Sequence, residues 1–236
     1  MNPIYLAIDI PDALIARQII DEVRDLIGGV KIGLTFAYAN GPAVIANTVA
    51  GLDWFFDAKI HDIPMQAAGA IRSIMPLHPN YISVHIGEFN PTASERDRWS
   101  EDLMMRAAVA AASDESVKLG VPRPKLLGVT ILTHVPATPT DILTKANRGL
   151  SCGLDGIVSS PLELRTLRAE LGTKPILVAT SLRSADIPVA GDDQLRLATP
   201  QEAKAGGADI LIIGRPIMQA SDRRAAAKAL LDSLEC

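Results

Sequence analysis

A short segment that follows an apolar run carries closely spaced acids and an amine. The run covers residues 52–56, and the charged residues are Asp57, Lys59 and Asp62. Side chains two residues apart in a strand point the same way, so we expect Asp57 and Lys59 to share one face. Asp62 lies beyond the strand end, where the chain turns before Pro64. Opposite charges at the end of an apolar strand predict a buried ion network, a frequent mark of active sites. An exposed salt bridge is the alternative.

Eight short apolar runs alternate with amphipathic stretches, and we interpret the runs as strands. They are Ile4–Asp9, Val30–Leu34, Trp54–Lys59, Tyr81–His85, Leu126–Thr133, Gly156–Ser159, Pro175–Thr180 and Ile210–Gly214. Continuously apolar strands joined through helices are typical of a parallel sheet with helices outside. Eight such units predict an α/β protein with one (β/α)8 TIM barrel, a single domain over residues 1–236. A doubly wound open sheet is the alternative, but no glycine-rich phosphate loop supports it.

Local signals predict where several helices begin. Two segments, Ser160–Glu163 and Thr199–Glu202, have the pattern of a capping box with proline at the first helical position. The longest irregular stretch runs from Glu88 to about Asp102, and we expect it to lead into an alanine-rich helix near Met104–Ala112.

Composition excludes several classes of protein. The 236 residues carry a net charge of -4, and only 4% are aromatic, which argues against a nucleic-acid partner. The two cysteines, Cys152 and Cys236, form neither a disulfide framework nor a zinc pattern. Neither a signal peptide nor an apolar run long enough to span a membrane is evident, so we expect a soluble cytoplasmic protein with no membrane partner.

Chemically useful residues gather at the carboxyl ends of the predicted strands, where barrel active sites lie. They are Asp9, Lys31, Asp57, Lys59, His85, Thr133, Gly214 and Arg215. Burying one unpaired charge is costly, so several charges are buried together only when they pair. We therefore expect an alternating set of two amines and two acids: Lys31, Asp57, Lys59 and Asp62.

The segment from Ile212 to Pro216 has features of an anion site. Gly214 allows a ligand close to the backbone, and Pro216 can begin a helix whose free N–H groups face an anion. Arg215 adds a guanidinium suited to phosphate. A plain strand-to-helix turn with a surface arginine is the alternative.

Taken in order, these segments resemble the orotidine 5'-monophosphate decarboxylase family along nearly the whole chain. The most specific pieces are Phe56–Pro64, Asp193–Pro200, Gly206–Asp209 and Ile213–Ile217. The resemblance implies a homodimeric barrel with shared active sites, using no metal and no organic cofactor. It implies loss of CO₂ from C6 of a pyrimidine nucleotide, giving uridine 5'-monophosphate in de novo pyrimidine biosynthesis.

The resemblance also implies roles for individual residues. Lys59 would protonate C6, Asp57 would lie beside the substrate carboxylate, and Lys31 would hold Asp57 and touch the ribose. Asp62 would reach the partner subunit's site. The substrate-binding residues would be Asp9 at the ribose, Thr133 at the base, and Arg183, Gln194, Gly214 and Arg215 at the phosphate.

Some positions depart from the family pattern. Met65-Gln66 replaces the usual Asn-Thr, so Gln66 must substitute in ribose binding or the contact is lost. His134 replaces a serine that reads the pyrimidine, and the loop from Leu182 to Asp193 has an unusual start before Arg183. The alternatives left open are a modified pyrimidine nucleotide as substrate and a barrel that binds a nucleotide without catalysis. A magnesium-dependent relative acting on a sugar-phosphate keto acid is a third, although Lys31 would repel the cation.

Overall fold

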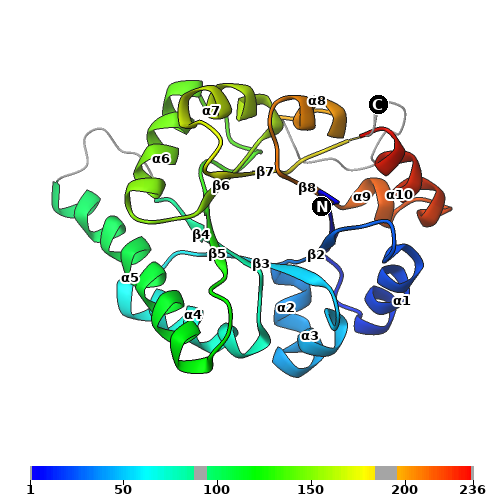
Figure 1. Ribbon diagram of the computed structural model, residues 1–236, viewed down its shortest axis with the longest axis horizontal. Helices are drawn as coiled ribbons and strands as arrows, with labels where there is room; N and C mark the ends of the chain where they lie inside the picture. Colours follow the sequence, from blue (N-terminus) through cyan, green and yellow to red (C-terminus); the bar gives the residue numbers. More distant parts are fainter. Residues whose placement is uncertain (1, 88–94, 184–195, 235–236) are drawn as a thin grey trace.

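Eight parallel strands pair in chain order and close into a barrel, with helices arranged around it (Figure 1). The computed structural model describes residues 2–87, 95–183 and 196–234. The strands are β1 (Ile4–Ile8), β2 (Gly29–Ile32), β3 (Asp53–Ile60), β4 (Tyr81–His85), β5 (Lys125–Val129), β6 (Gly156–Ser159), β7 (Ile176–Ala179) and β8 (Ile210–Ile213). Because β8 pairs with β1, the predicted (β/α)8 barrel is confirmed and the open sheet is wrong.

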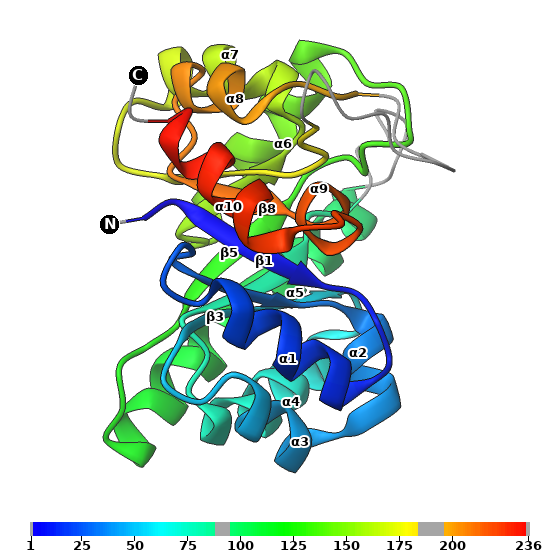
Figure 2. The same ribbon diagram turned by 90° about the vertical axis from the view of Figure 1, so that its right-hand side faces the viewer.

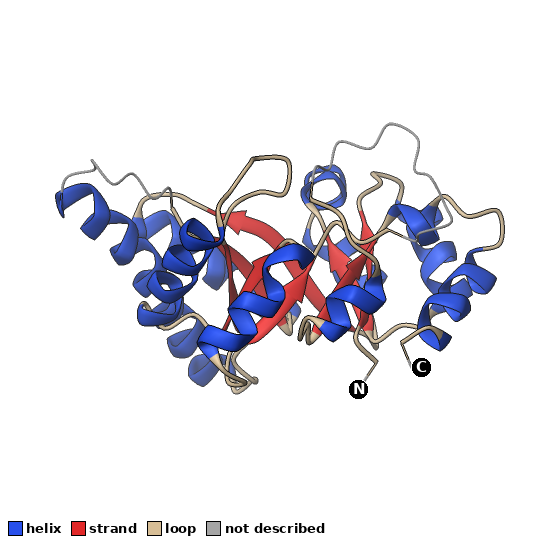
Figure 3. Cartoon of the chain, turned by 90° about the horizontal axis from the view of Figure 1, so that it is seen from above, coloured by secondary structure: helices blue, strands red, loops and turns tan. Residues whose placement is uncertain are grey.

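The helices form a ring around the strands (Figure 1), and in the side view they lie in front of the strands and to their left and right (Figure 3). They are α1 (Ala13–Val23), α2 (Leu34–Asn40), α3 (Pro42–Thr48), α4 (Pro64–Ile74), α5 (Glu95–Leu119), α6 (Pro139–Ser151), α7 (Leu164–Leu171), α8 (Pro200–Ala205), α9 (Arg215–Met218) and α10 (Arg223–Asp232), with 3₁₀ turns η1 (Met75–Leu77) and η2 (Pro161–Glu163). Within the described ranges, none of the helices is long and apolar enough to cross a membrane.

Helix α5 begins earlier than the sequence analysis predicts. Residues from Glu95 to Asp102 are helical, although they belong to the stretch predicted as irregular. Glutamate and arginine have high helix propensity, so these charged residues extend the alanine-rich helix. Residues 88–94 of the same predicted loop lie outside the described part of the chain.

Alternation along the strands gives the barrel an inner and an outer face. In β1, Ile4, Leu6 and Ile8 pack outward under the helices, whereas Tyr5 and Ala7 fill the barrel interior. In β1, β3 and β7 the next inward position past the apolar part carries a polar side chain, namely Asp9, Asp57 and Thr180. This regularity is how the fold delivers polar groups to the carboxyl ends of the strands.

One predicted capping box is confirmed and the other is wrong. The hydroxyl of Thr199 accepts a hydrogen bond from the backbone N–H of Glu202, whose carboxylate accepts from the backbone of Thr199. At the other site, Ser160 caps η2 by accepting from the N–H of Leu162, but Glu163 does not bond back to Ser160. Its carboxylate instead forms an ion pair with the guanidinium of Arg196. This charged donor binds a carboxylate more strongly than a neutral backbone N–H does.

The last helix closes the ring of helices against the first. Helix α10 lies beside α1 next to β1 (Figure 2), and the guanidinium of Arg224 is 2.6 Å from the carboxylate of Asp25. The helical layer is therefore continuous between the first and last βα units.

Candidate active site

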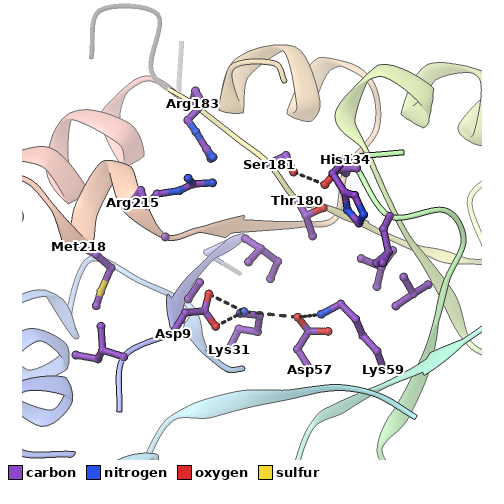
Figure 4. Close-up of a pocket in the computed structure, with 18 of the residues that line it drawn as sticks. Asp9, Lys31, Asp57, Lys59, His134, Thr180, Ser181, Arg183, Arg215 and Met218 are labelled. Atoms are coloured by element: carbon purple, nitrogen blue, oxygen red, sulfur yellow. Dashed lines mark hydrogen bonds and ion pairs between the residues drawn. The ribbon is translucent and has the colours of Figure 1, made fainter. Parts of the chain in front are cut away.

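Two amines and two acids form a row across the carboxyl end of the barrel (Figure 4). The amine of Lys31 is 2.8 Å from an oxygen of Asp9 and 3.5 Å from one of Asp57, and the amine of Lys59 is 2.7 Å from the same oxygen of Asp57. Lys31 and Asp57 are buried, whereas the side chains of Asp9 and Lys59 are 54% and 34% exposed. The pairs form an alternating network, so the exposed salt bridge considered as the alternative is wrong.

Within one chain, the second acid of this row is Asp9, whereas Asp62, which the sequence predicts to complete the row from the partner subunit, lies away from the row of its own chain. Asp62 lies past the end of β3, is exposed, and accepts a hydrogen bond from the backbone N–H of Ile63. Asp9, predicted to bind ribose, takes the place beside Lys31. The signal for Asp9 was available, since it continues the inward series of Tyr5 and Ala7.

Lys59 reaches Asp57 from an irregular part of β3. Phe56 pairs with Ile82 and Ile60 with Val84, so the register shifts between these two pairs, and Lys59 has a φ of 48°. Simple alternation therefore predicts the contact between Asp57 and Lys59 correctly, but this contact also depends on the irregular backbone between them. A non-glycine residue in the left-handed region costs free energy and persists only where its surroundings hold it.

Ser83, which the sequence analysis does not name, holds this irregular segment. Its hydroxyl is fully buried, accepts a 2.7 Å hydrogen bond from the backbone N–H of Lys59 and donates a 2.9 Å bond to Asp57. Its position on β4, two residues from the inward-facing Tyr81, is the signal that could have found it.

The network keeps its two buried members charged. Burial opposes the charged form of Lys31, but the carboxylates of Asp57 and Asp9 outweigh it, and the pKa of Lys31 is raised. Burial likewise opposes ionisation of Asp57, but the amines of Lys31 and Lys59 and the hydrogen bonds from Lys59 and Ser83 lower its pKa. Each buried charge is thus stabilised by its partners rather than by solvent.

Close packing at Gly33 fixes the outer end of the row. A Cβ atom at this position would lie within 3.1 Å of the amine of Lys31 and would collide with the carboxylate of Asp9. Glycine at position 33 therefore allows the Asp9–Lys31 ion pair to form.

The row faces a pocket of about 730 Å³ at the carboxyl end of the barrel. Two arginines, Arg183 and Arg215, lie across the pocket from the row (Figure 4), and Gly214 also lines it. Thr133 lines the pocket and accepts a 2.9 Å hydrogen bond from Ser181, and the exposed His134 follows it. The pocket therefore has a charged row on one side and two guanidinium groups on the other.

The remaining predicted residues lie elsewhere. Gln66 is exposed in the first turn of α4 and is not part of the pocket lining. Gln194 and most of the loop from Leu182 to Asp193 lie outside the described residues. His85 ends β4, also outside the pocket lining, with its ring stacked on that of His61 at 5.2 Å between centroids. In the described part of the chain, no group of three or more potential metal ligands is arranged around a common point.

Comparison with known proteins places the chain in a family. A family model described as orotidine 5'-phosphate decarboxylase / HUMPS family matches residues 2–230. The chain belongs to this family. The resemblance stated from the sequence is thereby confirmed.

Members of the orotidine 5'-phosphate decarboxylase / HUMPS family are similar to this chain over nearly its whole length. The protein named orotidine 5'-phosphate decarboxylase in Rhodospirillum rubrum is 36% identical, covering 97% of this chain and 92% of its own. The one in Paramagnetospirillum magneticum is 37% identical and covers 96% of both chains. The crystal structure of orotidine 5'-phosphate decarboxylase from Lactobacillus acidophilus has a TM-score of 0.75 at 24% identity, covering 100% of both chains, which supports the fold alone.

Proposed function

We propose that this protein decarboxylates orotidine 5'-monophosphate to uridine 5'-monophosphate, a step of pyrimidine biosynthesis, without a metal or organic cofactor. The observation that carries the proposal is the alternating row Asp9–Lys31–Asp57–Lys59 facing the two arginines across one pocket. Membership of the family and the names of the relatives support it.

The two sides of the pocket suit the two ends of a nucleotide. The guanidinium groups of Arg183 and Arg215 provide donors for a phosphate dianion, together with the backbone at Gly214. The base then lies toward Lys59, near Thr133 and His134, and the ribose lies toward Asp9 and Lys31. The phosphate thereby orients the substrate, and its binding energy contributes to the chemical step.

Lys59 is the proposed acid. As the bond between C6 and the carboxylate carbon breaks, CO₂ leaves and the electron pair remains on C6. An ammonium group already placed beside C6 stabilises this charge without solvent reorganisation and then donates its proton. Asp57 holds Lys59 in place at 2.7 Å and lies beside the substrate carboxylate. Enzymes lower barriers by about 8 to 23 kcal/mol, and this reaction requires the upper part of that range.

The proposed active enzyme is a homodimer in which Asp62 completes the partner's site. Ile63 and Met65, on the same segment, are 59% and 73% exposed. Large apolar side chains exposed together are typical of protein–protein interfaces. Gln66 lies on this segment too, so a second copy that covers it would bring Gln66 near the shared site.

His134 supports a second candidate substrate, a differently substituted pyrimidine nucleotide. The residue lines the pocket where the family pattern has a serine that reads the base. Comparing turnover of orotidylate with that of substituted analogues distinguishes the two candidates.

The direct test follows the ultraviolet absorbance of orotidylate with purified protein and no additives. We expect turnover by the wild type and a rate lower by at least about 10²- to 10⁴-fold in Lys59→Ala, because that is the contribution of one general acid alone. Lys125→Ala, which removes an exposed lysine at the opposite end of the barrel, is the matched control and should retain full activity.

Retained turnover by folded Lys59→Ala would refute its role as the acid. Tight nucleotide binding by the wild type without turnover would instead indicate a barrel that binds nucleotides and catalyses nothing.

A further inference from the structure

A second buried ion pair lies beneath the wall of the pocket formed by β5, β6 and β7. Arg196 and Glu163 are 8% and 7% exposed, and the guanidinium of Arg196 is 2.5 Å from the carboxylate of Glu163. The other carboxylate oxygen of Glu163 accepts a 2.8 Å hydrogen bond from Ser159, which lines the pocket. Neither charged residue faces the proposed substrate, so the proposed chemistry does not use them directly.

The guanidinium of Arg196 also holds the chain that leads to the base end of the pocket. Its second terminal nitrogen donates to the carbonyl oxygens of Ile131 and Leu132 at 3.0 and 3.1 Å. Strand β5 ends at Val129, so these carbonyls lie beyond the strand and directly precede Thr133 and His134. Arg196 thus supplies the hydrogen-bond donors that a neighbouring strand would otherwise supply.

The backbone after Arg196 holds the phosphate end. The N–H of Arg183 donates to the carbonyl of Ala198 at 3.0 Å, and Leu182 forms an isolated parallel bridge with Ala198. On the pocket side, Ser181 donates to Thr133 at 2.9 Å. These contacts close a ring that runs from Arg196 through Leu132, Thr133, Ser181 and Arg183 to Ala198 and back.

Two buried charges contribute little net stability compared with apolar packing, so stability alone does not account for this pair. We propose that Arg196, oriented by Glu163, is a positioning residue that sets the distance between the Thr133–His134 wall and Arg183. This inference rests on the proposed function, in which one nucleotide touches both ends of the pocket at once. The affinity of a ligand that contacts only one end of the pocket does not depend on that distance.

The experiment compares three ligands of folded Arg196→Met protein: uridine 5'-monophosphate, uridine and inorganic phosphate. We expect affinity for uridine 5'-monophosphate to fall about tenfold or more, while affinities for uridine and for phosphate each stay within about twofold. Arg196→Lys, which keeps a cation for Glu163 but cannot reach both carbonyls, should show the same selective loss and replaces Arg196→Met if that variant does not fold.

Arg168 provides the matched control at the opposite end of the barrel. It also binds an acid, Asp209, at 2.6 Å and carbonyl groups, those of Gly207 and Pro175. Arg168→Met should lower the midpoint of thermal unfolding while leaving all three affinities near those of the wild type.

Equal losses for all three ligands in the Arg196 variants, or no loss for uridine 5'-monophosphate, would overturn the positioning role alone. A wild-type protein that fails to bind uridine 5'-monophosphate would overturn the proposed function and this inference together.

Discussion

Lys31 and Asp57 show how two buried residues of opposite charge stay ionised inside a barrel. Each is buried, and each remains ionised because the other stands beside it, with Asp9 and Lys59 completing the row. Removing one member leaves an uncompensated charge, which costs about 3 to 5 kcal/mol at a buried site. The network is therefore both a candidate catalytic device and a determinant of stability.

The shifted pKa values predict how that stability depends on pH. The pKa of Asp57 lies below its ordinary value of about 3.9, so its contribution is present above about pH 4 and is lost as pH falls through the folded-state pKa. The pKa of Lys31 is raised above about 10.4, so its contribution is present below that pH and is lost as pH rises through the folded-state pKa.

Asp57→Asn tests the acid side of this dependence. We expect the variant to lose about 3 to 5 kcal/mol of unfolding free energy at pH 7, with the difference from wild type narrowing below about pH 4. Urea denaturation of both proteins at a series of pH values measures the difference in unfolding free energy at pH 7 and its change at lower pH. A difference that stays constant from pH 7 to pH 3 would contradict the ionised state assigned to Asp57.

Ser83 is the next residue to test. Ser83→Ala removes the acceptor for the Lys59 backbone N–H and a donor to Asp57, so we expect turnover to fall about tenfold or more. Ser83→Thr keeps a hydroxyl and should recover part of the activity. Ser151→Ala, which removes an exposed hydroxyl on α6, is the control and should behave as wild type in the same absorbance assay.

Turnover equal to that of the wild type in Ser83→Ala would show that Lys59 keeps its left-handed backbone conformation without the hydrogen bond to Ser83.

At the scale of elements, the turn from β8 into α9 is the proposed phosphate site. Arg215 begins α9 and lines the pocket together with Gly214. Arg215→Ala should weaken binding of uridine 5'-monophosphate about 10- to 100-fold, because a charge-assisted hydrogen bond contributes about 1.5 to 3 kcal/mol. Binding of uridine should change little. Arg72→Ala on the exposed face of α4 is the control, and titration calorimetry measures all three proteins.

Equal losses for uridine and its monophosphate would argue against a phosphate site at this turn. Binding of inorganic phosphate also distinguishes the role of Arg215 from that of Arg196, because only loss of Arg215 should weaken it.

The β3–α4 segment is the element whose proposed role depends on a second copy of the chain. It carries Asp62 away from the row of its own protomer and exposes Ile63 and Met65. A segment of this composition is unfavourable in water and favourable in an interface, which is why the dimer belongs to the proposed function.

At the scale of the whole molecule, the proposed shared sites predict complementation between inactive proteins. A hybrid of Lys59→Ala and Asp62→Ala subunits has one site with both residues intact. Random mixing should therefore restore about a quarter of wild-type turnover, since about half of the dimers are hybrids with one working site of two.

The control mixes Lys59→Ala with Asp57→Ala, two residues of the same protomer's row, and should restore nothing. No recovery in the first mixture, with subunit exchange demonstrated by differently tagged chains, would rule out a site completed by Asp62 of the partner.

Local patterns in the sequence determined the barrel and most of the row. Short apolar runs between amphipathic stretches predicted all eight strands, and alternation with a period of two placed Asp57 and Lys59 on one face. Position at the carboxyl end of a strand predicted that Lys31 and Arg215 lie at the site, and both line the pocket. These predictions succeeded because they depend only on residues near one another in the chain.

Only the tertiary structure decided which distant groups meet. Asp9 pairs with Lys31 at the outer end of the row, Ser83 on β4 supports Lys59 on the neighbouring β3, and Glu163 binds Arg196 instead of closing the predicted capping box. In each case several partners were chemically acceptable. The choice depended on which charge or hydroxyl the closed barrel brought within hydrogen-bond distance, and no local pattern contains that distance.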